Sequence, residues 1–156
     1  MFEIQPGDLG ALGEGPEGGG HIIRLGAVGA CLAKKFNKQE IIDRIMDNSI
    51  LKGITISGGE PLCKENIPEV LDFIKEVKQK RPNFNVWCYT GYTLEQLKER
   101  NDETTNNCLN EIDVLVDGRF VEARKDPTLR FRGSSNQRII DIHKSIEEKH
   151  IVQLAV

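Results

Sequence analysis

Apolar residues recur at helical spacing in two segments of the chain, with polar residues between them. The spacing predicts a helix over residues 38–49 and a second helix that Asn66 caps and that runs to about residue 80. A shorter helix is expected to begin at Thr93, because Gln96 three residues later completes a capping box. The apolar positions are Ile41, Ile42, Ile45 and Met46 in the first segment and Val70, Leu71, Ile74 and Val77 in the second.

Short apolar runs rich in β-branched residues lie between these helices and predict strands. The runs are residues 53–57, 85–90, 111–117 and 137–142, and a further short strand is expected within 21–33. Strands that alternate with helices are typical of βαβ units, so the sequence predicts an α/β fold with a parallel sheet. The arginine-rich stretch at 119–135 is expected to be irregular.

Polar turns that contain glycine follow three of the expected strands, at residues 57–60, 89–91 and 117–119. Because ligands of parallel sheets bind beyond the carboxyl ends of the strands, we expect a site where these turns meet. Gly58 and Gly59 let backbone groups approach a ligand, although the same pair also suits a tight strand-to-helix turn. Asp117 fits a helix cap as well as a ligand contact.

Composition divides the chain at residue 33. The first 33 residues hold nine of the 15 glycines, and no lysine or asparagine precedes Lys34. We therefore interpret residues 1–33 as an atypical, irregular, glycine-rich segment and residues 34–156 as one α/β domain. A shifted reading frame would produce such an abrupt change, and a natural segment of unusual composition is the alternative.

The net charge of the whole chain is small, whereas one stretch carries a concentrated positive charge. A net charge of −3 and the lack of an apolar run of about 20 residues argue against nucleic-acid and membrane partners and favour a cytoplasmic protein. Between Arg119 and Arg138, six basic residues face only Glu122 and Asp126, a local charge of +4. Such a stretch suits an anionic ligand or an acidic partner, and equally a solvated basic face.

The cysteines form no local metal motif. They are Cys31, Cys63, Cys88 and Cys108, and no two of them lie within 19 positions of each other. In a cytoplasmic chain such thiols are expected to be reduced and mostly buried as small apolar groups.

Four segments resemble, in order and spacing, the activating proteins of anaerobic ribonucleoside-triphosphate reductase. They are ITISGGEPL (54–62), VWCYTGYT (86–93), IDVLVDGRF (112–120) and KDPTLRFRGSSNQRIID (125–141). The resemblance covers residues 34 to about 155. It implies a radical S-adenosylmethionine (SAM) enzyme on a partial, open (βα) barrel with parallel strands.

The resemblance also implies an activity and its cofactors. In that family a [4Fe–4S] cluster reduces SAM, and the resulting 5′-deoxyadenosyl radical takes a hydrogen atom from a glycine of the large reductase subunit. SAM and a [4Fe–4S] cluster are thus the implied cofactors. The implied partners are the large subunit of the anaerobic reductase and a flavodoxin-like or other electron donor.

The same resemblance assigns cofactor-binding residues. Gly58, Gly59 and Glu60 match the motif whose backbone holds the methionyl amino group, and Ser57 precedes it as in relatives. The positions that match the surroundings of the same ligand are Tyr89, Thr90, Gly91 and Asp117. No catalytic residue is identified.

One feature of the family is missing. Its cluster is held by Cys-x3-Cys-x2-Cys upstream of the region that matches residue 34, where this chain has only Cys31. We therefore expect no metal ligands of that kind, unless the fold brings the distant cysteines together. Two functions follow: an activating enzyme, inactive in this chain for lack of the motif, or a cluster-less homologue that binds the reductase or a nucleoside without catalysis.

Overall fold

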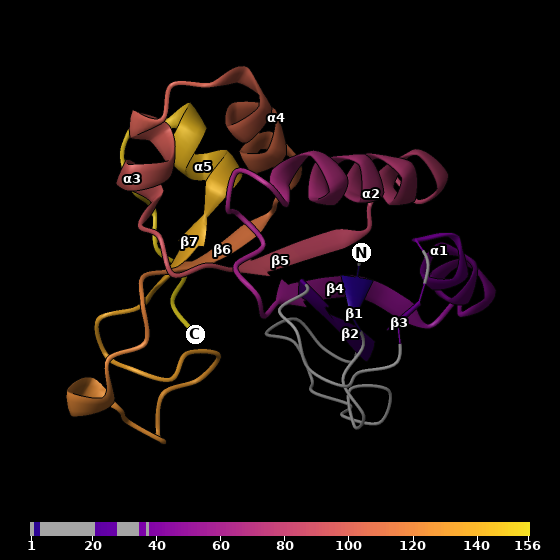
Figure 1. Ribbon diagram of the computed structural model, residues 1–156. Helices are drawn as coiled ribbons and strands as arrows, with labels where there is room; N and C mark the ends of the chain where they lie inside the picture. The colour runs from indigo at the N-terminus through magenta and orange to yellow at the C-terminus, as the bar shows by residue number, and fades with distance from the viewer. Residues whose placement is uncertain (1, 4–20, 28–34, 37) are drawn as a thin grey trace.

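The computed structural model describes residues 2–3, 21–27, 35–36 and 38–156 (Figure 1). The strands in these residues are β1 (Phe2–Glu3), β2 (His21–Ala27), β3 (Lys35–Phe36), β4 (Leu51–Ser57), β5 (Asn85–Tyr89), β6 (Val114–Asp117) and β7 (Arg138–Asp141). The helices are α1 (Lys38–Asp47), α2 (Ile67–Lys80), α3 (Leu94–Glu99), α4 (Glu103–Glu111) and α5 (Ile142–Glu147), with a 3-10 turn at Glu122–Arg124.

The described strands form one sheet in the order β3-β1-β2-β4-β5-β6-β7. Its centre, β2-β4-β5-β6, is parallel, and α2 and the pair α3–α4 make the connections between β4, β5 and β6. This confirms the α/β fold built from βαβ units. With β3 and β7 as its edges, the sheet is open across the described part of the chain.

Two features of the sheet differ from the prediction. β7 is antiparallel to β6, because only a 3-10 turn and irregular backbone connect them and no crossover helix carries the chain back. The prediction that residues 1–33 are irregular is wrong at residues 2–3 and 21–27, because these form β1 and β2 of the sheet. β2 is the short strand expected within 21–33, and it pairs with β4. The other residues up to 33, Cys31 included, lie outside the described ranges.

The three predicted helices are present as α1, α2 and α3. The expected capping box begins α3: Gln96 N donates to Thr93 Oγ1 at 3.2 Å, and Thr93 N donates to Gln96 Oε1 at 2.9 Å. We did not predict α4 and α5, because neither sequence carries a clear apolar stripe. The residues that α4 buries are Thr105, Cys108 and Leu109.

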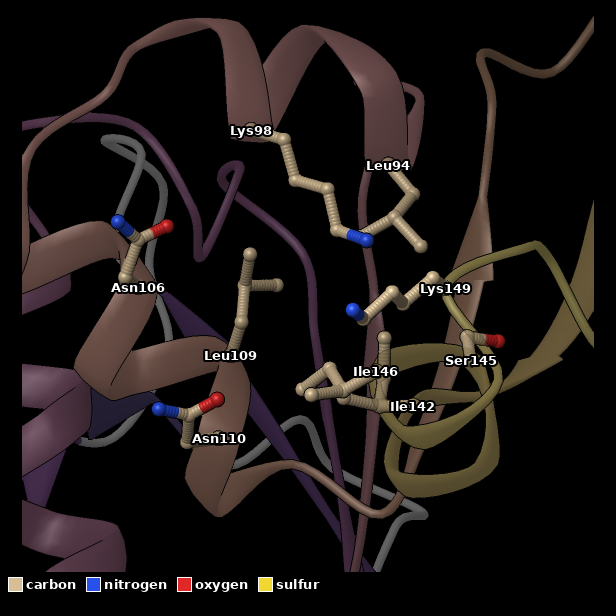
Figure 2. Close-up of a pocket in the computed structure, with 9 residues that line it drawn as sticks. All are labelled: Leu94, Lys98, Asn106, Leu109, Asn110, Ile142, Ser145, Ile146 and Lys149. Atoms are coloured by element: carbon tan, nitrogen blue, oxygen red, sulfur yellow. The ribbon is translucent and has the colours of Figure 1, made fainter.

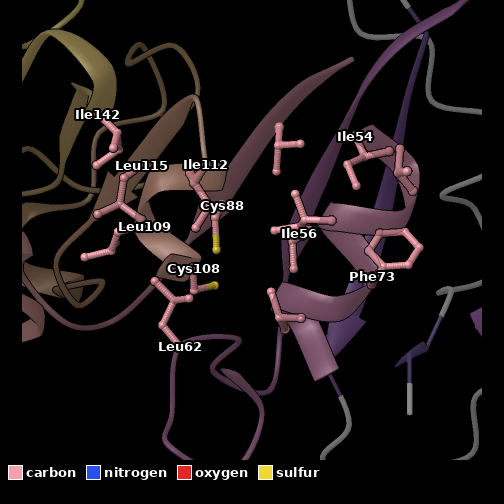
Figure 3. Packing of buried hydrophobic residues seen from close by; sticks show 14 of the residues in the cluster. Ile54, Ile56, Leu62, Phe73, Cys88, Cys108, Leu109, Ile112, Leu115 and Ile142 are labelled. Atoms are coloured by element: carbon pink, nitrogen blue, oxygen red, sulfur yellow. The ribbon is translucent and has the colours of Figure 1, made fainter. Parts of the chain in front are cut away.

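Residues of all five helices join one apolar cluster on a single face of the sheet, together with strand residues such as Ile54, Ile56 and Cys88 (Figure 3). A smaller cluster contains Trp87, Val114, Val116 and Ile139, with Phe131 from the 119–135 loop packed against it. No helix in the described residues has the length and apolar character needed to cross a membrane. The parallel pairing of β4, β5 and β6 places their carboxyl ends side by side at one edge of the sheet.

Candidate functional site

The predicted turns meet at one edge of the sheet, where β4, β5 and β6 end and β7 begins. A pocket of about 190 Å³ opens there. Five of the eight predicted ligand residues line it: Gly58, Glu60, Tyr89, Thr90 and Gly91. The structure therefore brings together the turns after β4 and β5, as the parallel arrangement requires.

The turn after β4 has an unusual backbone. Gly58, Gly59 and Glu60 all have positive φ angles, of 79°, 54° and 53°. Glycine adopts this region freely, but a glutamate there is strained unless its surroundings hold it. Both glycines are exposed and lack a Cβ, and Gly58 lines the pocket.

The side chain of Glu60 holds this turn against the next strand. Its Oε1 accepts hydrogen bonds from Thr90 Oγ1 at 2.6 Å and Leu62 N at 3.1 Å, and its Oε2 accepts one from Gly91 N at 2.8 Å. A Cβ on Gly91 would lie 3.2 Å from Oε2, so glycine permits this close approach. Both carboxylate oxygens are thus used to join the two turns.

Asn66 reinforces the same turn. We predicted it as the cap of α2, but its side chain makes no capping hydrogen bond. Its Nδ2 instead donates to the backbone oxygens of Gly59 at 3.3 Å and Glu60 at 3.0 Å. The predicted start of α2 at Asn66 is confirmed, since Asn66 is the N-cap residue, but its side chain holds the preceding turn and makes no hydrogen bond to the helix.

Asp117 is 1% exposed and does not line the pocket. Its Oδ2 accepts a hydrogen bond from Leu94 N, at the start of α3, at 2.8 Å. Both its oxygens also accept from Arg138, with Nε lying 2.9 Å from Oδ1. The sequence left two roles open for Asp117, a helix cap and a ligand contact. Its contacts within the chain are those of a residue that holds a helix terminus.

Arg138 extends this network to the surface. It donates to both carboxylate oxygens of Glu95, at 3.0 and 2.6 Å. The hydrogen bond from Arg138 lowers the pKa of Glu95 to about 2. The hydrogen bonds to Asp117 and then to Glu95 raise the pKa of Arg138 above its already high value.

Ser57 and Gly59 lie beside the pocket without lining it, Ser57 as the half-buried last residue of β4. Gly118 and Arg119 of the expected turn at 117–119 also line the pocket, as does Phe120. Sequence reasoning did not single out Pro61 and Gln137, which line it too. Gln137 was missed because only an antiparallel β7 brings it to this edge of the sheet. Its Nε2 donates a hydrogen bond to the Gly118 oxygen at 3.1 Å.

Comparisons with known proteins show which family the chain belongs to. The sequence profile of a 4Fe-4S single cluster domain matches residues 27–140, a span that includes all three turns. The chain belongs to the 4Fe-4S single cluster domain family. No solved structure matches it at a significant level.

The relatives of this 4Fe-4S family member confirm the resemblance found in the sequence. It is 41% identical over 103 residues to the anaerobic ribonucleoside-triphosphate reductase-activating protein of Haemophilus influenzae, covering 65% of this chain and 64% of the relative. It is 38% identical over 104 residues to the protein of that name in Escherichia coli K12, and the match covers 66% of this chain and 65% of the relative. It is 33% identical over 95 residues to the protein of that name in Enterobacteria phage T4, and the match covers 60% of this chain and 56% of the relative. The chain thus spans less than two thirds of the length of these relatives.

Membership of the 4Fe-4S family supports an iron–sulfur cluster, but the described cysteines do not fit one. No group of three or more metal-ligating side chains occurs in the described residues. Cys88 and Cys108 are buried, and burial raises the pKa of Cys108 to about 12 and that of Cys88 well above its usual value. Cluster ligands are thiolates, which these buried sites disfavour. Cys63 lies apart from both, and Cys31 is outside the described ranges.

One buried polar atom near the strand-end pocket has no partner. The buried Oδ1 of Asn136 accepts no hydrogen bond from the described residues. An added Cβ on Gly118, which lines the pocket, would lie 3.8 Å from the Nδ2 of the same amide, but Asn136 itself does not line the pocket. A buried acceptor without a donor carries a free-energy cost, which no group in the described residues offsets.

Proposed function

We propose that this chain acts as an activating protein of an anaerobic ribonucleoside-triphosphate reductase, forming a glycyl radical on the large reductase subunit by reductive cleavage of SAM. The proposal extends to a radical-SAM type of partial barrel, a flavodoxin-like or other electron donor, and a cytoplasmic setting. Its support is the similarity to proteins named for that activity and the exposed Gly58–Gly59 backbone that Glu60 holds at the pocket.

Several residues in and beside the pocket have a role in this proposal. Gly58 and Gly59 would present backbone groups to the methionyl amino group of SAM, while Glu60 fixes the turn through Thr90 and Gly91. Tyr89 lines the same wall, and its hydroxyl donates to the Phe131 backbone oxygen at 2.6 Å, which orients the ring. Bound there, SAM would supply the adenosyl group for the radical chemistry that the resemblance implies.

SAM binding tests the placement of the ligand. Isothermal titration should give one SAM site per chain, and Gly59→Val should weaken it at least tenfold, because valine strains a backbone with φ of 54° and covers its polar groups. Thr104→Val, on the exposed side of α4, is the matched control and should bind like the parent. If neither Gly59→Val nor Glu60→Ala weakens binding, the ligand lies elsewhere.

The second candidate function is a cluster-less module that binds the reductase or a nucleoside. The observation that favours it is the separation and burial of the described cysteines. Anaerobic reconstitution with iron and sulfide distinguishes the two candidates. About four irons and four sulfides per chain support the enzyme, and an iron-free product together with retained binding of the reductase supports the module.

We also propose that the chain divides at residue 33 and that a shifted reading frame accounts for residues 1–33. The change in composition at Lys34 supports this, although the family match begins earlier, at residue 27. Sequencing the DNA of about the first 40 codons and translating all frames tests the idea. A Cys-x3-Cys-x2-Cys run in another frame just before Lys34 would supply the missing ligands, and its absence from every frame would leave the natural alternative.

A further inference from the structure

A second, larger pocket lies between α3, α4 and α5 and shares no lining residue with the strand-end site (Figure 2). Its volume is about 380 Å³, within the range of sites for small organic molecules. The apolar part of its wall comes from Leu94, Leu109, Ile142 and Ile146. Ile146 is 44% exposed, so this wall offers apolar surface to solvent.

Two lysines face each other across this apolar wall. Figure 2 shows the side chains of Lys98, from α3, and Lys149, just after α5, extending their ammonium groups toward the space between them. Among the described residues, no ion pair or hydrogen bond is made by either ammonium group. The residues that line the pocket include no Asp or Glu. Both lysines are exposed, so two ammonium groups without an acidic partner among the described residues are available to a ligand at this pocket.

The backbone at Lys149 is unusual for a lysine. Its φ angle is +56°, and it directly follows the C-cap of α5, Glu148. Helices commonly place glycine at this position, because a residue with a Cβ is strained in the left-handed region. The chain thus tolerates local strain at the residue that carries one of the two ammonium groups into the pocket.

Polar groups without partners complete the wall formed by α4. Asn106 and Asn110 lie one helical turn apart and both line the pocket. Their side-chain amides are exposed and make no hydrogen bond within the described part of the chain. The pocket therefore combines an apolar wall, two cationic donors and two amides, which is the usual make-up of a site for a small ligand.

We propose that this pocket binds a small organic anion, whose carboxylate or phosphate lies between Lys98 and Lys149 and whose apolar body packs against Leu109 and Ile146. A fully polar anion would leave the apolar wall in contact with water, and a neutral apolar molecule would leave both ammonium groups without a partner. The proposal concerns a site separate from SAM binding and stands whether or not the chain is an activating enzyme.

Four probes separate the contributions of charge and apolar body. Titration calorimetry would use 1-naphthoate, 1-naphthyl phosphate, the neutral 1-naphthalenemethanol and inorganic phosphate. At least one of the two aromatic anions should bind at one site per chain, at least tenfold more tightly than either the neutral molecule or inorganic phosphate. The preferred anion then identifies carboxylate or phosphate as the recognised group.

Variants locate the site. Lys98→Gln and Lys149→Gln should each weaken binding of the preferred anion about tenfold, as loss of a charged hydrogen bond does. Lys149→Gly should weaken it equally while leaving the fold intact, because glycine relaxes the backbone there. Lys75→Gln, an exposed lysine of α2 outside the pocket, is the matched control for net charge.

Three outcomes would overturn the proposal. They are no saturable binding of either aromatic anion, equal binding of the neutral molecule, and binding that Lys98→Gln and Lys149→Gln leave unchanged. Circular dichroism of each variant shows that a loss of affinity does not come from unfolding. Competition with SAM distinguishes this pocket from the strand-end site, since SAM should not displace the anion.

Discussion

In the pocket at the strand ends, Glu60, Thr90 and Gln137 all form hydrogen bonds with neighbouring parts of the chain, and exposed glycine backbone remains for a ligand. In the pocket between the helices, the backbone is committed to helices, while Lys98 and Lys149 have no partner among the described residues. If both proposals hold, recognition would depend at the first site on how a turn is held and at the second on charge. Substitutions should therefore affect stability at the first site and mainly affinity at the second.

The largest effect is expected at Asp117. Asp117→Ala should lower the free energy of unfolding by about 3–5 kcal/mol, because it leaves Arg138 and the start of α3 without their buried partner. Urea denaturation measures the loss. Asp72→Ala, which removes an exposed carboxylate paired with Lys38, should cost at most about 1 kcal/mol. Equal losses in the two variants would contradict the structural role of Asp117.

A smaller loss is expected at Glu60. Glu60→Gln should cost about 1–3 kcal/mol, since its amide nitrogen cannot accept the hydrogen bond that Gly91 N or Thr90 Oγ1 now donates. Thr90→Val removes one of these donors and the Oγ1 acceptor of Tyr92 N, but it leaves the carboxylate bound to Gly91 N and Leu62 N and should cost less. Urea denaturation of both variants checks the order, and a Thr90→Val loss larger than that of Glu60→Gln would show that the carboxylate is not the centre of the network.

The hydrogen bonds between Arg138 and Glu95, at the exposed end of the Asp117 network, should make stability depend on pH in the acid range. The pKa of Glu95 is lowered to about 2 in the folded chain, from the 4.5 that is usual for a glutamate. Its contribution is therefore complete above about pH 4.5 and is lost as the pH falls toward 2. The contribution is modest, because half of the side chain is exposed. Glu95→Gln should flatten this part of the stability curve, and an unchanged curve would argue against the Arg138 pair.

The smallest effect on stability, and one of opposite sign, is expected at Lys149. Lys149→Gly should raise the free energy of unfolding by about 0.5–1 kcal/mol, because glycine carries no penalty at a φ angle of +56°. Lys98→Gln should change it by less than about 0.5 kcal/mol. A clear destabilisation by Lys149→Gly would mean that the lysine side chain supports the fold rather than a ligand.

What the sequence predicted well is local. The capping box of Thr93 and Gln96 requires only four consecutive positions, and the ends of β4, β5 and β6 follow from apolar runs. The direction of β7 was out of reach, since it depends on a connection without a helix, and the role of Gln137 was missed with it. The N-cap position of Asn66 was visible in the sequence, but the hydrogen bonds of its side chain to a turn six and seven positions away were not.

The placement of β7 also affects when the strand-end pocket becomes complete during synthesis. Gly58 and Gln137 line the same pocket although about 80 positions separate them in the chain. A nascent chain emerging from the ribosome amino end first acquires the turns after β4 and β5 well before Gln137 is available. The pocket therefore exists only in molecules that have added their last strand, and an incomplete translation product would present the turns without the wall that closes them.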